Sequence, residues 1–199
     1  MDSPAATLIL GVALIASLIG LYASPGLIER NLLRPYWFLR RQQYATLVTS
    51  AFIHASLGHL LFNALTLWSF GFPLERRIGS PRFVALYAFG LLASGLGTVW
   101  KQRGNPEYAC LGASGAILAV LFASIAYFPT QSIMIMPLPV PIPAPLFALG
   151  YLAYTLYAAR QARGRINHDA HLGGALAGLV FVALTDPGVI SRALDRLLP

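Results

Sequence analysis

Ser114 lies in a sequence context typical of an accessible nucleophile. It belongs to the run LGASGA at residues 111–116, where Gly112 and Gly115 leave its hydroxyl without the shield of neighbouring Cβ atoms. An apolar stretch starts here, and the first turn of a helix presents unpaired N–H groups. A nucleophile beside such donors is what acyl transfer requires, because the donors stabilise a developing oxyanion. A packing face made of small residues is the alternative interpretation.

His171 stands above a groove of small residues on the last apolar stretch. Gly174 and Gly178 follow it at i+3 and i+7, on the same side of a helix. Such a face lets another backbone approach closely, so His171 can come within hydrogen-bonding reach of a serine on a second helix. His168 is a competing base, one turn earlier, without a groove aligned as well. Asp169 falls on the opposite side of the helix from His171, so the pattern predicts a Ser–His dyad without a carboxylate.

Three further polar residues fall within the second apolar stretch. His59 and Asn63 are spaced i, i+4 and therefore share one helix face. His54 precedes His59 by five residues, about 140° around a helix. Hydrogen bonds between helices are one role for these side chains. A zinc site is disfavoured because neither a carboxylate nor a thiolate accompanies them, and we expect no metal or cofactor.

The acidic residues exclude several other kinds of site. All seven fall in expected loops, tails or span ends, which leaves no carboxylate for a proton relay or for an intramembrane aspartyl protease. A His-Glu-x-x-His zinc motif is also absent from the sequence. The seven residues are Asp2, Glu29, Glu75, Glu107, Asp169, Asp186 and Asp195.

The composition places these residues in a membrane protein. Of 199 residues, 57% are hydrophobic and 11% are charged, and the mean hydropathy is +0.65. A soluble domain carries roughly 25% charged residues. A soluble domain and a disordered chain are therefore excluded, and Cys110, the single cysteine, excludes a disulfide scaffold. The net charge of +7 is dispersed over loops beside apolar stretches, which favours a bilayer with anionic headgroups as partner over nucleic acid.

Six apolar stretches predict an all-α membrane protein with six transmembrane helices, because backbone amides in hydrocarbon must be satisfied internally. We expect a single domain over residues 1–199. The first stretch lacks a basic region before it, so it is not interpreted as a cleavable signal peptide. Prolines that alternate with apolar residues over 137–145 predict an extended connector. The expected spans are about 5–23, 44–72, 83–100, 109–128, 144–159 and 170–184.

Together these motifs resemble those of the rhomboid intramembrane serine proteases, over about residues 45–184. The second stretch carries H-x4-H-x3-N at 54–63, and the following segment carries E-x-R-x-G at 75–79. The nucleophile motif G-x-S-G stands at 112–115, and A-H-x-x-G-x3-G stands at 170–178. All four motifs occur in the family's order and on the expected spans, so a six-helix rhomboid-like bundle is expected.

The resemblance implies a role for each residue of the site. Ser114 would be the nucleophile, and His171 the general base and then the acid. His59, Asn63 and the Ser114 amide would form the oxyanion hole. The implied activity is that of an intramembrane endopeptidase, which cleaves transmembrane segments of protein substrates through an acyl-enzyme.

The resemblance also implies supporting roles, and the chain departs from the family at two places. His54 would be structural, and Glu75 and Arg77 would brace the loop in which they lie. A Trp-Arg pair that the family often has before the second span is missing here. Many members carry an aromatic residue four positions after the nucleophile, packed on the base. Leu118 stands there, so another group must orient the imidazole.

Two other classes of protein compete with the protease. A non-catalytic rhomboid-like protein that binds or escorts membrane clients is the first alternative, but such relatives usually lose the Ser or the His. A small transporter or channel is the second, and the lack of intramembrane carboxylates and of a repeat argues against it.

The distribution of Lys and Arg residues and the family resemblance predict opposite orientations of the chain in the membrane. An even number of spans puts both termini on one side, which carries five of the 14 Lys and Arg residues, while the other side carries nine. The positive-inside rule then places the termini outside. The resemblance implies cytoplasmic termini with the site opening outward. We follow the resemblance and expect a multi-pass protein of the plasma (inner) membrane of a prokaryote.

Overall fold

The computed structural model describes residues 2–135, 138–161 and 167–197, and these residues are mainly helical. The helical elements are α1 (Pro4–Leu18), η1 (Ile19–Ala23), α2 (Pro25–Asn31), α3 (Pro35–Arg40), α4 (Thr46–Thr49), η2 (Ser50–Phe52), α5 (Leu57–Thr66), η3 (Leu67–Gly71), α6 (Phe72–Ile78), α7 (Ser80–Gln102), α8 (Ser114–Tyr127), α9 (Ala144–Gln161), α10 (His168–Thr185) and α11 (Pro187–Leu197). Between α8 and α9, the strands β1 (Ser132–Ile135) and β2 (Leu138–Pro143) form an antiparallel hairpin where the prolines predicted extended backbone.

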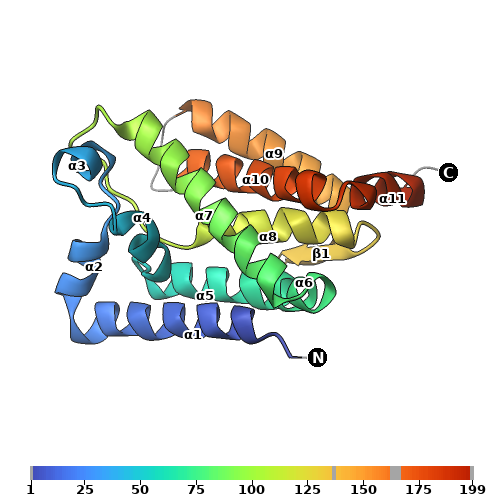
Figure 1. Ribbon diagram of the computed structural model, residues 1–199, viewed down its shortest axis with the longest axis horizontal. Coiled ribbons are helices and arrows are strands. Elements are labelled where there is room, and N and C mark those ends of the chain that lie inside the picture. Colours follow the sequence, from blue (N-terminus) through green and yellow to red (C-terminus); the bar gives the residue numbers. More distant parts are fainter. Residues whose placement is uncertain (1, 136–137, 162–166, 198–199) are drawn as a thin grey trace.

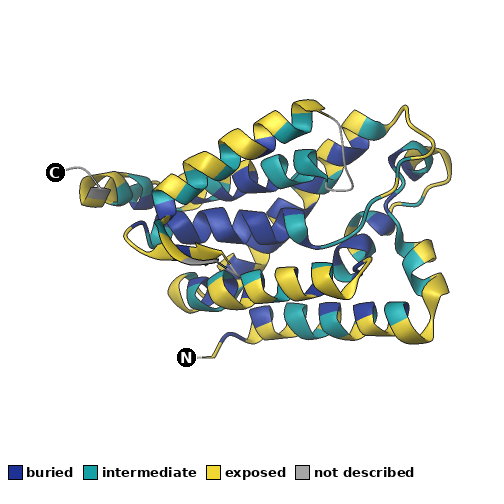
Figure 2. Cartoon of the chain, turned by 180° about the vertical axis from the view of Figure 1, so that it is seen from behind, coloured by how far each residue is buried: buried dark blue, intermediate teal, exposed yellow. Residues whose placement is uncertain are grey.

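Helix α8 runs through the middle of the bundle (Figure 1). Every residue from Gly115 to Ala126 is buried, and α8 contacts α5, α7, α9 and α10. Figure 2 shows this contrast, with α8 buried along its length and exposed residues on the helices around it. Large apolar side chains cover those outer faces, as lipid contact requires. Examples are Leu8 and Ile15 on α1, Phe62 on α5, Leu149 on α9 and Leu184 on α10.

The prediction of an all-α membrane protein is confirmed, whereas the number of spans stays a prediction. By length and composition, three described helices can cross a membrane: Pro4–Ala23, Ser80–Gln102 and His168–Thr185. A fourth span results if Thr46–Phe52 and Leu57–Ile78 are counted together. Helix α8 is apolar but has only 14 residues, about 21 Å at 1.5 Å per residue, against a hydrocarbon core of about 30 Å.

The second expected span, a continuous helix over 44–72, is corrected by the structure. The chain bends by 91° between η2 and α5, and the helical path then continues to Ile78. Ser56 starts α5 by accepting a hydrogen bond from the backbone N–H of His59, at 3.2 Å. His54 thus lies in the break and not on a helix, so the expected angle between it and His59 does not apply. Its Nδ1 lies 2.9 Å from the Ser17 hydroxyl of α1, which ties the break to the first helix.

The position of Glu75 is also different from the expected one. It lies in α6 with 1% of its surface exposed, rather than in a loop. Its carboxylate accepts hydrogen bonds from the backbone N–H groups of Ala5 and Ala6, at 3.0 and 2.7 Å, and from the Ser80 hydroxyl at 2.6 Å. These donors satisfy a charge that would be costly to bury alone, and two of them belong to the first turn of α1. Arg77 is exposed and has no hydrogen bond or ion pair within the described part of the chain.

Candidate active site

Helices α8 and α10 meet backbone to backbone. A Cβ added at Gly174 would lie 2.0 Å from the Gly115 carbonyl oxygen, and one at Gly178 would lie 2.2 Å from that of Ala119. No side chain larger than hydrogen fits at either position. The glycine groove expected from the sequence is therefore occupied by the main chain of α8, directly beside the residue that follows Ser114.

This close approach brings Ser114 and His171 together. Ser114 is the first residue of α8, and His171 lies in the first turn of α10, one turn before Gly174. The distance from His171 Nε2 to Ser114 Oγ is 2.8 Å. A hydroxyl hydrogen-bonded to an imidazole nitrogen is the arrangement of an activated serine nucleophile.

The second nitrogen of His171 contacts a residue that the sequence analysis did not single out. Tyr151 of α9 places its hydroxyl oxygen 3.1 Å from His171 Nδ1. The tyrosine ring stacks on Phe147 and packs against Phe122, with centroid distances of 5.7 and 5.9 Å. The only sequence signal for this contact was indirect: Leu118 cannot orient the imidazole, so some other group has to.

The two alternatives near His171 have other partners. His168 makes no hydrogen bond to Ser114, and its ring lies 5.6 Å from that of Tyr154. Asp169 forms an ion pair with Lys101 of α7, at 2.6 Å, instead of contacting His171. Within the described residues, the Ser–His pair thus has no carboxylate beside it.

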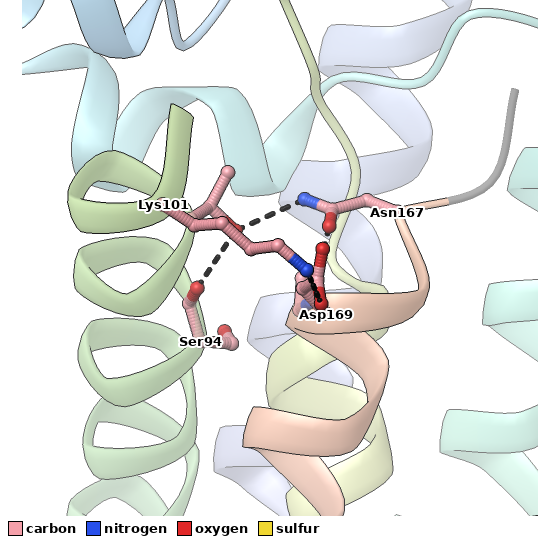
Figure 3. A network of polar contacts seen from close by, with 6 residues as sticks. Ser94, Lys101, Asn167 and Asp169 are labelled. Carbon is pink, nitrogen blue, oxygen red and sulfur yellow. Dashed lines mark hydrogen bonds and ion pairs between the residues drawn. The ribbon is translucent and has the colours of Figure 1, made fainter. Parts of the chain in front are cut away.

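Polar contacts join the end of α7 to the start of α10 (Figure 3). Asn167 caps α10 by accepting a hydrogen bond from the Ala170 N–H at 3.1 Å, and it donates to the Thr98 hydroxyl at 3.0 Å. Lys101 reaches Asp169 from the same end of α7. A cavity of about 50 Å³ lies between these helices and Ser114, and it has room for a few waters.

His59 lies against the loop that leads into α8. Gly112 has a φ of +110°, and a Cβ there would lie 2.5 Å from His59 Cε1 and 2.9 Å from its Nε2. Glycine is required at this position for both reasons. The imidazole of His59 thus lies against Gly112, two residues before Ser114 in the sequence.

Asn63 follows His59 by one turn of α5. It is 4% exposed, and its side-chain nitrogen has no hydrogen-bond partner within the described residues. A buried N–H group without a partner is unusual, and a developing oxyanion would satisfy it. No described hydrogen bond joins His59 or Asn63 to Ser114, so their part in an oxyanion hole stays a prediction. Across the described residues, no group of three or more His, Cys, Asp or Glu side chains converges on a metal site.

The fold and this site define an all-α membrane protein with a paired serine and histidine between two close-packed helices. The family profile described as Rhomboid domain matches residues 41–187, most of the chain. The chain therefore belongs to the rhomboid family.

Individual relatives agree with this assignment. Rhomboid protein 1, mitochondrial, of Saccharomyces cerevisiae is 32% identical over 171 residues, which cover 80% of this chain and 47% of the relative. The presenilin-associated rhomboid-like protein, mitochondrial, of Homo sapiens is 34% identical over 144 residues, 68% of this chain and 36% of the relative. Rhomboid protease GluP of Bacillus subtilis is 30% identical over 138 residues, 69% and 25% of the two chains. The chain spans less than half the length of each of these relatives.

The relatives change the expectation for the location of the protein. The chain is an integral membrane protein. Its expected place in a prokaryotic plasma membrane is not supported, because two of these three relatives are named as mitochondrial and one is bacterial.

Proposed function

We propose that the chain is an intramembrane serine endopeptidase that cleaves transmembrane segments of other membrane proteins. The observation that carries the proposal is the 2.8 Å contact between Ser114 Oγ and His171 Nε2 inside a helical membrane fold. Membership of the rhomboid family, in which one relative is named a protease, supports it.

The chemistry follows from the roles of two atoms, His171 Nε2 and Ser114 Oγ. His171 Nε2 takes the proton of the Ser114 hydroxyl while the oxygen attacks a peptide carbonyl. The tetrahedral oxyanion would accept hydrogen bonds from the Ser114 N–H, which lies in the first turn of α8, and from His59 and Asn63. His171 then gives its proton to the leaving amine, and an acyl-enzyme remains. Water, deprotonated by His171, hydrolyses the ester and restores Ser114.

The substrate must present an unfolded segment to this site. In a transmembrane helix each carbonyl is hydrogen-bonded within the helix and surrounded by side chains. Attack by Ser114 therefore requires locally extended backbone. We expect substrates to carry helix-destabilising residues such as glycine or proline near the scissile bond.

The two ends of the described chain support a common side for both termini. In Figure 1 they lie at the same end of the bundle, while the first turn of α8 lies toward the other end. We propose that the site opens on the side of the membrane opposite to the termini. A reporter fused at the C-terminus, compared with one in the 101–108 loop, tests this arrangement.

Covalent labelling tests the nucleophile directly. The full chain in detergent or liposomes is treated with a fluorophosphonate probe and given a single-span reporter protein. Wild type is expected to become labelled and to cleave the reporter, and Ser114→Ala is expected to lose both activities. Ser124→Ala is the matched control, since Ser124 is a buried serine further along α8, away from His171. Folded wild-type protein that neither labels nor cleaves would instead favour a binding or escort protein.

A further inference from the structure

Tyr151 occupies the place beside the base where serine hydrolases commonly have a carboxylate. Its hydroxyl oxygen lies 3.1 Å from His171 Nδ1, on the side of the imidazole opposite to Ser114. We infer that Tyr151 is a positioning residue, which fixes the tautomer and the orientation of His171. This inference rests on the proposed protease function.

The tautomer matters because only one form of the neutral imidazole can accept the serine proton. In that form Nε2 is unprotonated and the hydrogen resides on Nδ1. A partner that accepts from Nδ1–H stabilises this form. The Tyr151 oxygen is the only hydrogen-bond partner that Nδ1 has among the described residues.

A tyrosine hydroxyl can also donate, so its own proton needs another acceptor. Thr155 lies one turn further along α9, on the same face as Tyr151. It is fully buried, and its hydroxyl oxygen has no hydrogen-bond partner within the described part of the chain. If the Tyr151 proton points to Thr155, the tyrosine oxygen is left to accept from His171. A hydrogen bond from Tyr151 to Thr155 would therefore set the direction of the hydrogen bond between His171 and Tyr151.

The ring of Tyr151 is held in place independently of its hydroxyl. It stacks on Phe147 with an interplanar angle of 25° and packs against Phe122 of α8. A change to phenylalanine keeps these contacts and removes only the oxygen. Tyr151→Phe thus separates positioning of the base from packing of α9.

The matched control comes from the same helix. Tyr157 is 65% exposed and makes no described hydrogen bond, so Tyr157→Phe removes an equivalent hydroxyl elsewhere on α9. For each variant we would measure kcat and KM for reporter cleavage, the rate of fluorophosphonate labelling and the melting temperature. Tyr151→Phe is expected to lower kcat and the labelling rate by the same factor, about tenfold, with KM and melting unchanged. Thr155→Val is expected to give a smaller loss in the same two rates, and Tyr157→Phe none.

Two outcomes would overturn the inference. Unchanged kcat and labelling in Tyr151→Phe would show that the hydroxyl does nothing for the base. A change in KM alone would show that Tyr151 contacts the substrate instead.

A measurement that needs no activity separates this inference from the proposed function. The ¹⁵N NMR signals of His171, assigned by their loss in His171→Gln, report which ring nitrogen carries the hydrogen. Wild type is expected to hold the hydrogen on Nδ1, and Tyr151→Phe to show a mixture. If this holds while wild type neither labels nor cleaves, only the protease proposal fails. Identical ¹⁵N signals in both proteins would refute the positioning role.

Discussion

On its α8 side, helix α10 is packed through main chain, whereas on its α9 side it is packed through side chains. Gly174 and Gly178 leave no space between α10 and α8, because an added Cβ would overlap a carbonyl oxygen of α8. Helix α9 is different: of its residues only Ala144 and Thr155 are buried, and a Cβ added at Gly150 would meet nothing within 4 Å.

The difference divides the work of the candidate site between two kinds of contact. The distance between Ser114 and His171 depends on the close approach of two backbones, and this contact tolerates few substitutions. The orientation of His171 depends on one hydroxyl from a helix with little other burial. Changes at the first contact should therefore have larger effects than changes at the second. The first prediction below tests this order directly, and the others rank further contacts of the candidate site below it.

The largest effect is expected at the α8–α10 contact. Gly174→Ala must push the helices apart, since its Cβ would lie 2.0 Å from the Gly115 oxygen. We expect a loss of about 1–3 kcal/mol in stability. We also expect kcat to fall at least about a hundredfold, because the proposed nucleophile, Ser114, and the proposed base, His171, separate. Gly150→Ala is the control and should keep activity, with stability equal or slightly higher. Equal behaviour of the two variants in melting and cleavage assays would remove the distinction between the helices.

Loss of the proposed oxyanion donor Asn63 should rank next, because we expect it to lower kcat without the loss of stability expected for Gly174→Ala. Asn63→Ala is expected to lower kcat about 10²–10³-fold with little change in KM, because the donor acts on the transition state. Thr66→Val serves as control, since its hydroxyl bonds only the Phe62 carbonyl of its own helix. Steady-state cleavage assays measure both variants. An Asn63→Ala enzyme with wild-type kcat would place the oxyanion donors elsewhere.

The cap of α10 should contribute less. Asn167→Ala removes the acceptor for the Ala170 N–H and the bond to Thr98, at an expected cost of about 1 kcal/mol in unfolding free energy. Asp169→Asn breaks only a partly exposed ion pair with Lys101 and should cost between about 0 and 1 kcal/mol. Denaturant titrations in the same detergent compare the two. A larger loss from Asp169→Asn would contradict the importance of the cap.

The smallest effect is expected at Cys110, in the loop before α8. Its side chain is partly buried against a small apolar cluster that includes Leu33 and Val99. Because little of the thiol is open to reagents, alkylation by iodoacetamide should be slow at pH 7. Cys110→Ala should keep full activity. Fast labelling at pH 7 would show that the loop beside the site is open.

The parts of the site set by local spacing were predictable from the sequence. Flanking glycines marked Ser114 at a helix start, and spacing of i+3 and i+7 placed the glycine groove under His171. Both patterns act within one or two helical turns. The family's motifs then connected the two helices, which periodicity alone cannot do.

The rest depended on contacts between distant segments. The bend at residues 53–56 was hidden because both arms are apolar and read as one stretch. Glu75 was expected in a loop. Its burial could not be predicted, because its three donors lie on α1 and at the start of α7, and no local pattern reveals them. Tyr151 is one of three tyrosines at intervals of three on α9, and only the packing of that helix selects it.

The short length of α8 sets the expected depth of the proposed cleavage. One end of the helix lies at Tyr127, whose hydroxyl contacts Asp186 beside Arg192, which suits a membrane surface. The helix is about 9 Å shorter than the hydrocarbon core, so with Tyr127 at one boundary of the core we expect Ser114 to lie about that distance below the opposite boundary. Measured along a substrate helix, 9 Å corresponds to about six residues. Substrates are therefore expected to be cut about two turns inside the membrane boundary, which mapping of the cleavage site by mass spectrometry would reveal.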